Sequence, residues 1–113
     1  MQETMGAIVH ANIVDRAMLQ ACYMPFVDGG GLFIASNQKV SLGQSIFVLA
    51  TLPEQSQKIP LTGKIIWISH KQSGLKPQGF AIQLSGEKGG YYRNEAEKLL
   101  AGSLVSQQQN YTM

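Results

Sequence analysis

The sequence predicts a mainly β fold: five or six short antiparallel strands in a small barrel or sandwich, with a short N-terminal helix and a C-terminal α-helix. Two observations favour this fold. Short runs rich in β-branched and aromatic residues recur as far as residue 84, with Gly, Pro and Asn between them. A helical pattern takes over only after residue 90. The 113 residues suffice for one modest core, so we expect a single domain over residues 1–105 and a polar tail over residues 106–113.

Five or six short antiparallel strands are expected before the C-terminal helix. Alternation in residues 6–13 places Val9, Ala11 and Ile13 on one face. The longest run, residues 58–69, is long enough to bend, and Pro60 and Gly63 fit a bulge or a corner inside it. The other strand-like runs are residues 32–35, 45–52 and 78–84.

Two helices are expected, one on either side of the β-rich region. Asp15 is a suitable N-cap for a short helix from Arg16 to about Tyr23, which Pro25 would stop. After the glycine-rich residues 86–90, the pattern becomes that of an amphipathic helix. Its apolar face would carry Tyr92, Ala96, Leu99 and Leu100.

Composition argues against several classes of partner. Charged residues make up 14% of the chain, the net charge is +2, and Lys and Arg are scattered, so no basic patch for nucleic acid is predicted. No apolar run approaches the roughly 20 residues that span a bilayer, so no membrane insertion is expected. With Cys22 as the single cysteine, no intrachain disulfide can form, and we expect a cytoplasmic protein.

The residue types that carry catalysis do not form a recognisable set. His10 and His70 lack a Cys, Asp or Glu at metal-ligand spacing, and the sequence places no base beside Cys22. The glycine triplet, residues 29–31, precedes a strand, whereas a phosphate-binding loop follows a strand and opens a helix. We therefore expect no enzyme activity, no metal and no cofactor.

The aromatic segment, residues 23–26, consists of Tyr23, Met24, Pro25 and Phe26 and stands just before the glycine triplet. Its rings must either pack in the core or contact a partner. We expect Phe26 in the core and Tyr23 at the surface. For Trp67, strand alternation predicts the same face as Ile65. Trp67 would then either pack under the C-terminal helix or stand partly exposed beside the aromatic segment as part of a docking patch.

Three segments resemble the pattern of the PilZ-domain family. In residues 25–34 a double glycine enters a strand, in residues 63–67 a glycine precedes an apolar strand that ends in Trp, and residues 79–84 form a Gly-apolar-apolar-Gln-apolar strand. The resemblance covers residues 6–102 and implies a six-stranded antiparallel barrel with a C-terminal helix. More narrowly, residues 21–27, the glycine triplet and residues 100–102 resemble the family members that take part in type IV pilus assembly.

The chain departs from this family where most members bind cyclic di-GMP. They use an Arg-x-x-x-Arg pair and an Asp/Asn-x-Ser-x-x-Gly motif. Here Arg16 is the only arginine before the barrel, and the residues four positions to either side are not arginine. Counted back from Gly31, Phe26 takes the acidic position and Asp28 takes the serine position. Because several charge-assisted hydrogen bonds would be lost, we expect no direct binding of cyclic di-GMP.

The resemblance to pilus-assembly members implies an adaptor that regulates pilus biogenesis and twitching motility. Its implied partners are the pilus-extension ATPase and a regulator with degenerate cyclase/phosphodiesterase domains that senses cyclic di-GMP. The implied contact surface is the aromatic segment around Tyr23, with Trp67 as a candidate neighbour. An alternative is a β-barrel module that binds cyclic di-GMP or single-stranded nucleic acid, with bases stacked on Trp67 and Tyr23.

Overall fold

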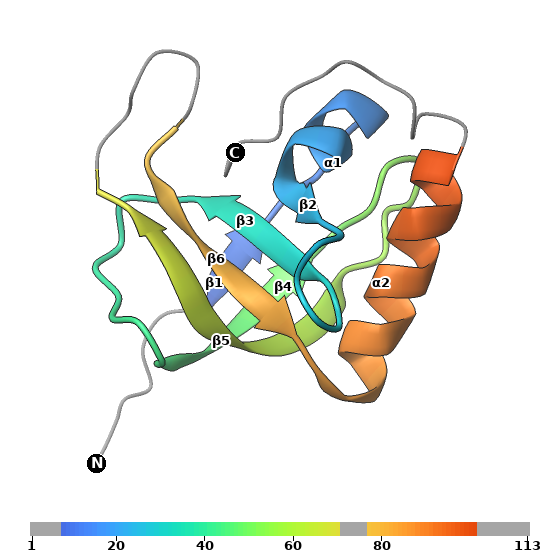
Figure 1. Cartoon of the computed structure of the whole chain (residues 1–113). Helices are drawn as coiled ribbons and strands as arrows, with labels where there is room; N and C mark the ends of the chain where they lie inside the picture. The colour runs from blue at the N-terminus through green and yellow to red at the C-terminus, as the bar shows by residue number, and fades with distance from the viewer. Residues whose placement is uncertain (1–7, 71–76, 102–113) are drawn as a thin grey trace.

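The computed structural model describes residues 8–70 and 77–101. The predicted polar tail, residues 106–113, lies outside the described residues. Eight elements follow one another along the chain (Figure 1): β1 (Val9–Ala11), α1 (Arg16–Cys22), β2 (Tyr23–Met24), β3 (Gly31–Ala35), β4 (Ser45–Ala50), β5 (Ile59–Ser69), β6 (Gly79–Leu84) and α2 (Gly86–Leu100). No helix within the described residues is long and apolar enough to span a membrane.

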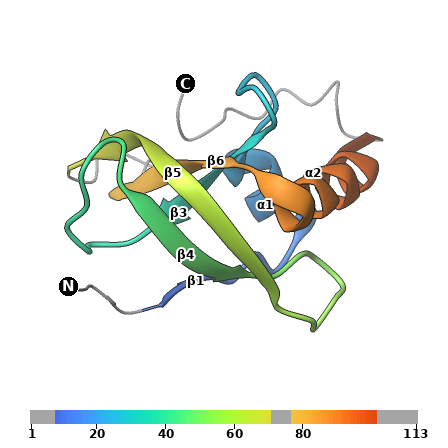
Figure 2. The ribbon, with the colours of Figure 1, turned by 90° about the horizontal axis from the view of Figure 1, so that it is seen from below.

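The six strands form one sheet in the order β1-β4-β5-β6-β3-β2, which curls into a half-barrel (Figure 2). The predicted mainly β fold with two helices is confirmed. One pairing differs from the expected antiparallel arrangement, because β1 runs parallel to β4, with Val9 opposite Val48 and Ala11 opposite Ala50. A parallel pair needs a long crossover connection, and the chain from α1 through β3 supplies it.

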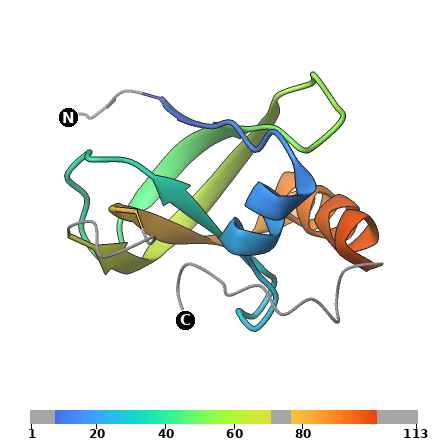
Figure 3. The ribbon, with the colours of Figure 1, turned by 90° about the horizontal axis from the view of Figure 1, so that it is seen from above.

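Most of the core fills the concave side of the sheet, where both helices also pack (Figure 3). Met24, Phe33 and Ala81 are buried on the other side. Helix α2 contacts β5 and β6, and α1 contacts α2 and β3. Strand register shows which side chains share this inner face, because paired residues point to the same side of a sheet. The inner face carries buried Val48, Leu61, Ile65, Ile82 and Leu32, among others.

Helix α1 begins as the sequence predicts and ends one residue sooner. The Oδ1 atom of Asp15 accepts a hydrogen bond of 2.8 Å from the backbone N–H of Met18, which caps the first turn. The helix ends at Cys22 because Tyr23 already belongs to β2, where it pairs with Leu32. The short strand β2 was not predicted, since two paired residues leave no periodic pattern in a sequence.

Helix α2 begins at Gly86, several residues before the start that the sequence indicates. The sequence pattern indicates a loop for the glycine-rich residues 86–90, yet these residues are helical and Gly89 is buried. A Cβ atom at this position would lie 3.2 Å from the carbonyl carbon of Leu84. Glycine therefore lets the first turns of α2 approach the end of β6 closely, and this close packing outweighs its low helix propensity.

Thr51 connects the edge strand to the helix. Its Oγ1 accepts a hydrogen bond from the N–H of Ile13 at 2.9 Å and donates to the carbonyl oxygen of Ile13 at 3.2 Å. In this way a side chain extends the parallel ladder beyond the end of β1. The carbonyl oxygen of Thr51 in turn accepts a 2.9 Å hydrogen bond from the hydroxyl of Tyr92 in α2.

Replacement of Tyr92 by Phe should lower the free energy of unfolding by about 1–2 kcal/mol, because the buried Tyr92 hydroxyl is lost and the Thr51 carbonyl is left without that donor. The neighbouring Tyr91 is exposed, so Tyr91→Phe is a matched control that should change stability by less than about 0.5 kcal/mol. Urea unfolding followed by circular dichroism measures both. Equal stability of the two variants would contradict this role of Tyr92.

Candidate partner-binding surface

A β-bulge decides where Trp67 points. Ile65 pairs with Ile82, but Trp67 pairs with Ala81, and the register shifts between them. Because neighbouring residues of β6 face opposite sides of the sheet, Ile65 points into the core and Trp67 points outward. The expectation that these two side chains share a face was therefore wrong. The bulge predicted at Pro60 or Gly63 lies further along β5, and Trp67 is 42% exposed.

The convex side of the sheet, which we call the outer face, presents Trp67 together with other exposed side chains. Register places Phe47 beside Thr62, and Lys64 between Ser45 and Gln83, on this same face. Phe47 is also exposed. Within the six strands that the structure describes there is no Asp, Glu or Arg, and Lys64 is their one lysine. The outer face is therefore aromatic and weakly basic.

Tyr23 is a core residue, contrary to the expectation that it lies at the surface. It pairs with Leu32 on the inner face and is 2% exposed. Its hydroxyl donates a 2.6 Å hydrogen bond to Oε2 of Glu97 in α2, which Arg93 also approaches at 3.5 Å. Burial, and then the hydrogen bond to Glu97, raise the pKa of Tyr23 well above its usual value, so its hydroxyl stays protonated.

Phe26 is exposed, again the reverse of the expectation, with 58% of its surface accessible. Pro25 beside it is exposed too, whereas Met24 is buried. The reason is geometric, because burial of Tyr23 and Met24 on opposite faces of β2 leaves the next two residues to turn outside the sheet. Of the aromatic segment, Pro25 and Phe26 are thus the side chains that a partner can reach.

The loop that carries Phe26 is held firmly against β6. The N–H of Gly30 donates to the carbonyl oxygen of Val27 at 2.7 Å, and the N–H of Leu84 donates to that of Gly30 at 2.9 Å. The side-chain amide of Gln83 donates to the carbonyl oxygen of Asp28 at 2.8 Å. These contacts fix both ends of the turn, so Phe26 is presented from an ordered support.

The glycine triplet makes this tight turn possible. Gly29 and Gly30 have φ angles of 81° and 91°, which side chains strongly disfavour. A Cβ atom at Gly30 would also lie 3.0 Å from the hydroxyl oxygen of Tyr23. Gly31 is crowded in the same way, since a Cβ atom there would lie 3.1 Å from the side chain of Val27 and 3.2 Å from that of Met24. The triplet therefore serves packing of the loop rather than phosphate binding.

The loop that carries Phe26 is joined to the face of the sheet that presents Trp67. The side chain of Gln83 lies on the outer face and holds the loop of Phe26. Ala81, two residues earlier on β6, lies on that face beside Trp67. Two residues along a strand span roughly 7 Å, so the supports of the two aromatic side chains are neighbouring rows of one face. We call Phe26, Trp67 and Lys64 the outer aromatic patch.

The positions of the degenerate cyclic di-GMP motif are dispersed. Arg16 begins α1, and its Nε lies 3.9 Å from Oε2 of Glu54 in the β4–β5 loop. Asp28 in the β2–β3 loop and Gly31 at the start of β3 come after the other end of α1, which is about 10 Å long. The surroundings of Gly31 are filled by apolar side chains. The structure therefore does not bring these residues together as a phosphate and guanine site.

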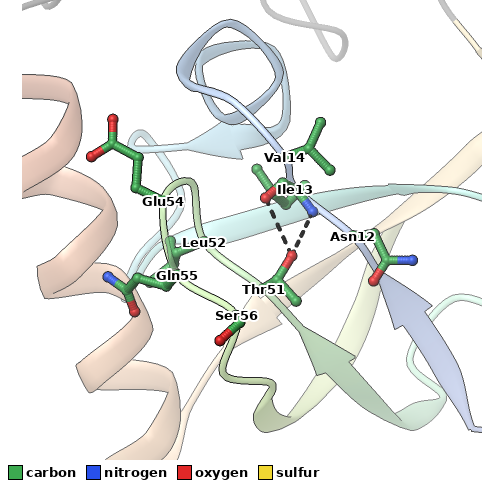
Figure 4. A pocket seen from close by; sticks show the side chains of 8 residues that line it. All are labelled: Asn12, Ile13, Val14, Thr51, Leu52, Glu54, Gln55 and Ser56. Atoms are coloured by element: carbon green, nitrogen blue, oxygen red, sulfur yellow. Dashed lines mark hydrogen bonds between the residues drawn. The ribbon is translucent and has the colours of Figure 1, made fainter.

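An open groove of about 680 Å³ lies between the exit of β1 and the β4–β5 loop (Figure 4). Glu54 on its wall has a φ angle of 67°, the one positive φ of a non-glycine residue within the described chain. The groove is lined by Asn12, Ile13, Val14, Thr51, Leu52, Glu54, Gln55 and Ser56. Its walls are partly apolar, with Ile13 and Leu52 buried, and they carry no arrangement of acid and base that would suit catalysis.

Reactive groups elsewhere are buried or scattered. Burial raises the pKa of the Cys22 thiol to about 12, so the reactive thiolate is scarce at neutral pH. Among the described residues, no three His, Cys, Asp or Glu side chains gather closely enough to hold a metal ion.

Comparison with protein families adds the decisive observation, since the PilZ domain family matches residues 6–100. The chain belongs to the PilZ-domain family. Such domains are in general non-enzymatic modules that sense cyclic di-GMP or act as adaptors. A search of curated proteins found no match. The family assignment agrees with the curled sheet and the C-terminal helix. It does not by itself distinguish a cyclic di-GMP sensor from an adaptor, so that distinction must come from the residues of this chain.

Sequence reasoning missed Phe47 as an exposed aromatic residue. A signal was present, because residues 45–50 alternate and place Phe47 opposite the buried Ile46 and Val48. The bulge that turns Trp67 outward left no comparable signal, since no glycine or proline marks Ile66.

Tyr23→Ala should destabilise this PilZ domain by about 3–5 kcal/mol, because it removes a fully buried ring and its hydrogen bond to Glu97. Phe26→Ala removes an exposed ring and should change stability by less than about 0.5 kcal/mol. Thermal and urea unfolding of the two variants and the wild type test whether Tyr23 is the buried ring and Phe26 the exposed one. A stable Tyr23→Ala protein would contradict the buried placement.

Proposed function

We propose that this PilZ-domain protein is a non-enzymatic adaptor in the cytoplasm that regulates type IV pilus biogenesis and twitching motility. Its proposed partners are the pilus-extension ATPase and a regulator with degenerate cyclase/phosphodiesterase domains. The observation that carries the proposal is the outer aromatic patch, in which Phe26 occupies the acidic position of the nucleotide motif and is exposed. The local resemblance of residues 21–27 to pilus-assembly members supports the choice of partners.

The outer aromatic patch has the physical character of a protein-binding site. Phe26 and Trp67 offer large rings with few rotatable bonds, and such side chains provide much of the binding energy at interfaces. Both are held by ordered backbone, one by the loop contacts to β6 and the other by its ladder pairing with Ala81. Preorganised aromatic side chains lose little conformational entropy on binding. Lys64 favours a partner whose apolar patch is edged by acidic side chains.

The same residues argue that cyclic di-GMP is sensed by a partner rather than by this chain. Arg16 lies near Glu54, and the ring of Phe26 stands where a hydrogen-bond acceptor would be needed. The carboxylate of Asp28 would repel a nearby phosphate. A signal carried by cyclic di-GMP would then reach the ATPase through the regulator and this adaptor.

A calorimetric titration with cyclic di-GMP should give no saturable binding up to about 100 μM, because the charge-assisted contacts are lacking. A PilZ domain that retains both arginines and the Asp/Asn-x-Ser-x-x-Gly motif is the positive control. Micromolar or tighter binding to this chain would refute the proposal that it acts without the nucleotide.

The purified pilus-extension ATPase from the same bacterium should bind this chain saturably, and Phe26→Ala and Trp67→Ala should each weaken binding at least about tenfold. Both positions are exposed, so the fold should remain intact. Tyr91→Ala is a control, because Tyr91 is an aromatic residue on α2 that is about as exposed as Trp67 and should leave the affinity unchanged. Isothermal titration calorimetry of the four proteins measures these affinities.

Three outcomes separate the alternatives. Wild-type binding that both patch variants leave unchanged would place the interface elsewhere on the domain. No wild-type binding at tens of micromolar, roughly −6 kcal/mol or weaker, would refute the ATPase as a direct partner. An affinity for single-stranded oligonucleotides that falls steeply with salt would favour the nucleic-acid alternative instead.

A further inference from the structure

Strand β1 leaves one edge of the described sheet without a neighbouring strand. The carbonyl oxygen of Ala11 accepts from the N–H of Thr51, and the backbone of Ile13 pairs with the Thr51 hydroxyl, so these residues turn their polar groups toward β4. Alternate residues of a strand direct their backbone groups to opposite sides. His10 and Asn12 therefore direct their N–H and C=O groups away from β4, toward the open edge.

Apart from the shortness of β1, this edge lacks the features that usually prevent edge-to-edge pairing. Residues 8–14 contain no Lys, Arg, Asp, Glu or Pro, and no bulge interrupts the pairing of β1 with β4. Two apolar side chains are exposed along it, Ile8 at 50% and Val14 at 70%. An uncharged edge with exposed apolar residues is suited to pairing with another strand.

We propose that this edge pairs antiparallel with the same edge of a second copy of the chain, about a two-fold axis at Ala11. In this register Ile8 lies opposite Val14 of the partner subunit, and His10 lies opposite Asn12 of the partner subunit. His10 and Asn12 carry outward backbone groups, so each of these opposed pairs exchanges two hydrogen bonds, and pairing of Ile8 with Val14 would continue the same alternation. The two exposed apolar side chains cover each other at both ends of the pairing.

The order of apolar and polar residues along residues 8–14 favours this register, and it favours a second copy of the chain as the partner. A shift that centres the axis on His10 would place Ile8 opposite Asn12, and a centre at Asn12 would place Val14 opposite His10. Each shifted register sets an apolar side chain against a polar one. The register at Ala11 matches apolar with apolar and polar with polar, which is the self-complementarity that a two-fold interface requires. No like charges face each other across it.

The interface is small, so the dimer is expected to be reversible. Pairing over about seven residues per chain buries less than the roughly 1,200 Å² of a typical stable complex. At the rim of the groove, the partner's Ile8 would lie beside Val14. This edge is formed by β1, whereas the outer aromatic patch lies over β5, β6 and the β2–β3 loop. Dimerisation and the proposed adaptor contacts therefore do not depend on each other.

Sedimentation equilibrium of the full chain up to about 1 mM tests the proposal. The wild type should show a monomer–dimer equilibrium. Val14→Lys and Ile8→Glu should each raise the dissociation constant at least about tenfold, because each sets a charge against an apolar side chain twice in the dimer. The double variant sets Lys against Glu across the interface and should return the dissociation constant to within about threefold of the wild type.

Phe26→Lys serves as the control, because it adds the same charge at an exposed apolar residue beyond the opposite edge strand. It should leave dimerisation unchanged, and circular dichroism should show that all variants remain folded. A wild type that stays monomeric throughout would overturn the proposal. So would a dimer that Val14→Lys does not weaken, and a double variant without recovery would overturn the register centred on Ala11.

Discussion

Thr51 holds together the side of the half-barrel that no further strand closes. Its amide and hydroxyl bind the backbones of Ala11 and Ile13, and its carbonyl accepts the hydroxyl of Tyr92. One residue at the end of β4 thereby positions the parallel edge strand and the C-terminal helix against each other. Because Tyr92 is fully buried, its hydroxyl needs such an acceptor, and this requirement fixes how α2 lies over the core.

A second buried tyrosine determines what the surface presents. Tyr23 brings its ring into the core and its hydroxyl to Glu97, which joins β2 to α2 at the opposite edge of the sheet. Tyr23 and Met24 point to opposite sides of β2, and Phe26 follows them in a turn outside the sheet, where its ring cannot reach the core. The glycine triplet then turns the chain back along β6. The exposure of Phe26 thus follows from the demands of the core, as does the ordered loop that supports it.

The elements that the sequence predicted are those with a repeated pattern. The alternation of residues 6–13, 45–52 and 78–84 and the cap at Asp15 gave correct elements, because periodicity and capping are local properties. The reversed positions of Tyr23 and Phe26 depend on a two-residue strand and on a partner 74 residues away, Glu97, which no local pattern encodes. The outward turn of Trp67 depends on a bulge whose position is set by the register between β5 and β6. Of the five residues predicted to contact a partner, the structure exposes Pro25, Phe26 and Trp67 and buries Tyr23 and Met24.

In the proposed function, a single residue, Phe26, accounts both for the absence of nucleotide binding and for docking to a protein partner. At the position of the acidic motif residue, Phe26 removes an acceptor that guanine would require and adds an exposed ring on an ordered loop. Arg16, the one arginine near the position of the family's arginine pair, is directed to Glu54 and not to the β2–β3 loop that carries Phe26. The ring of Phe26 and the orientation of Arg16 both make the binding free energy of an anionic nucleotide less favourable. The exposed ring also adds apolar area that a protein partner could bury. A PilZ domain altered in this way is expected to retain its fold and to transmit the signal through protein contacts.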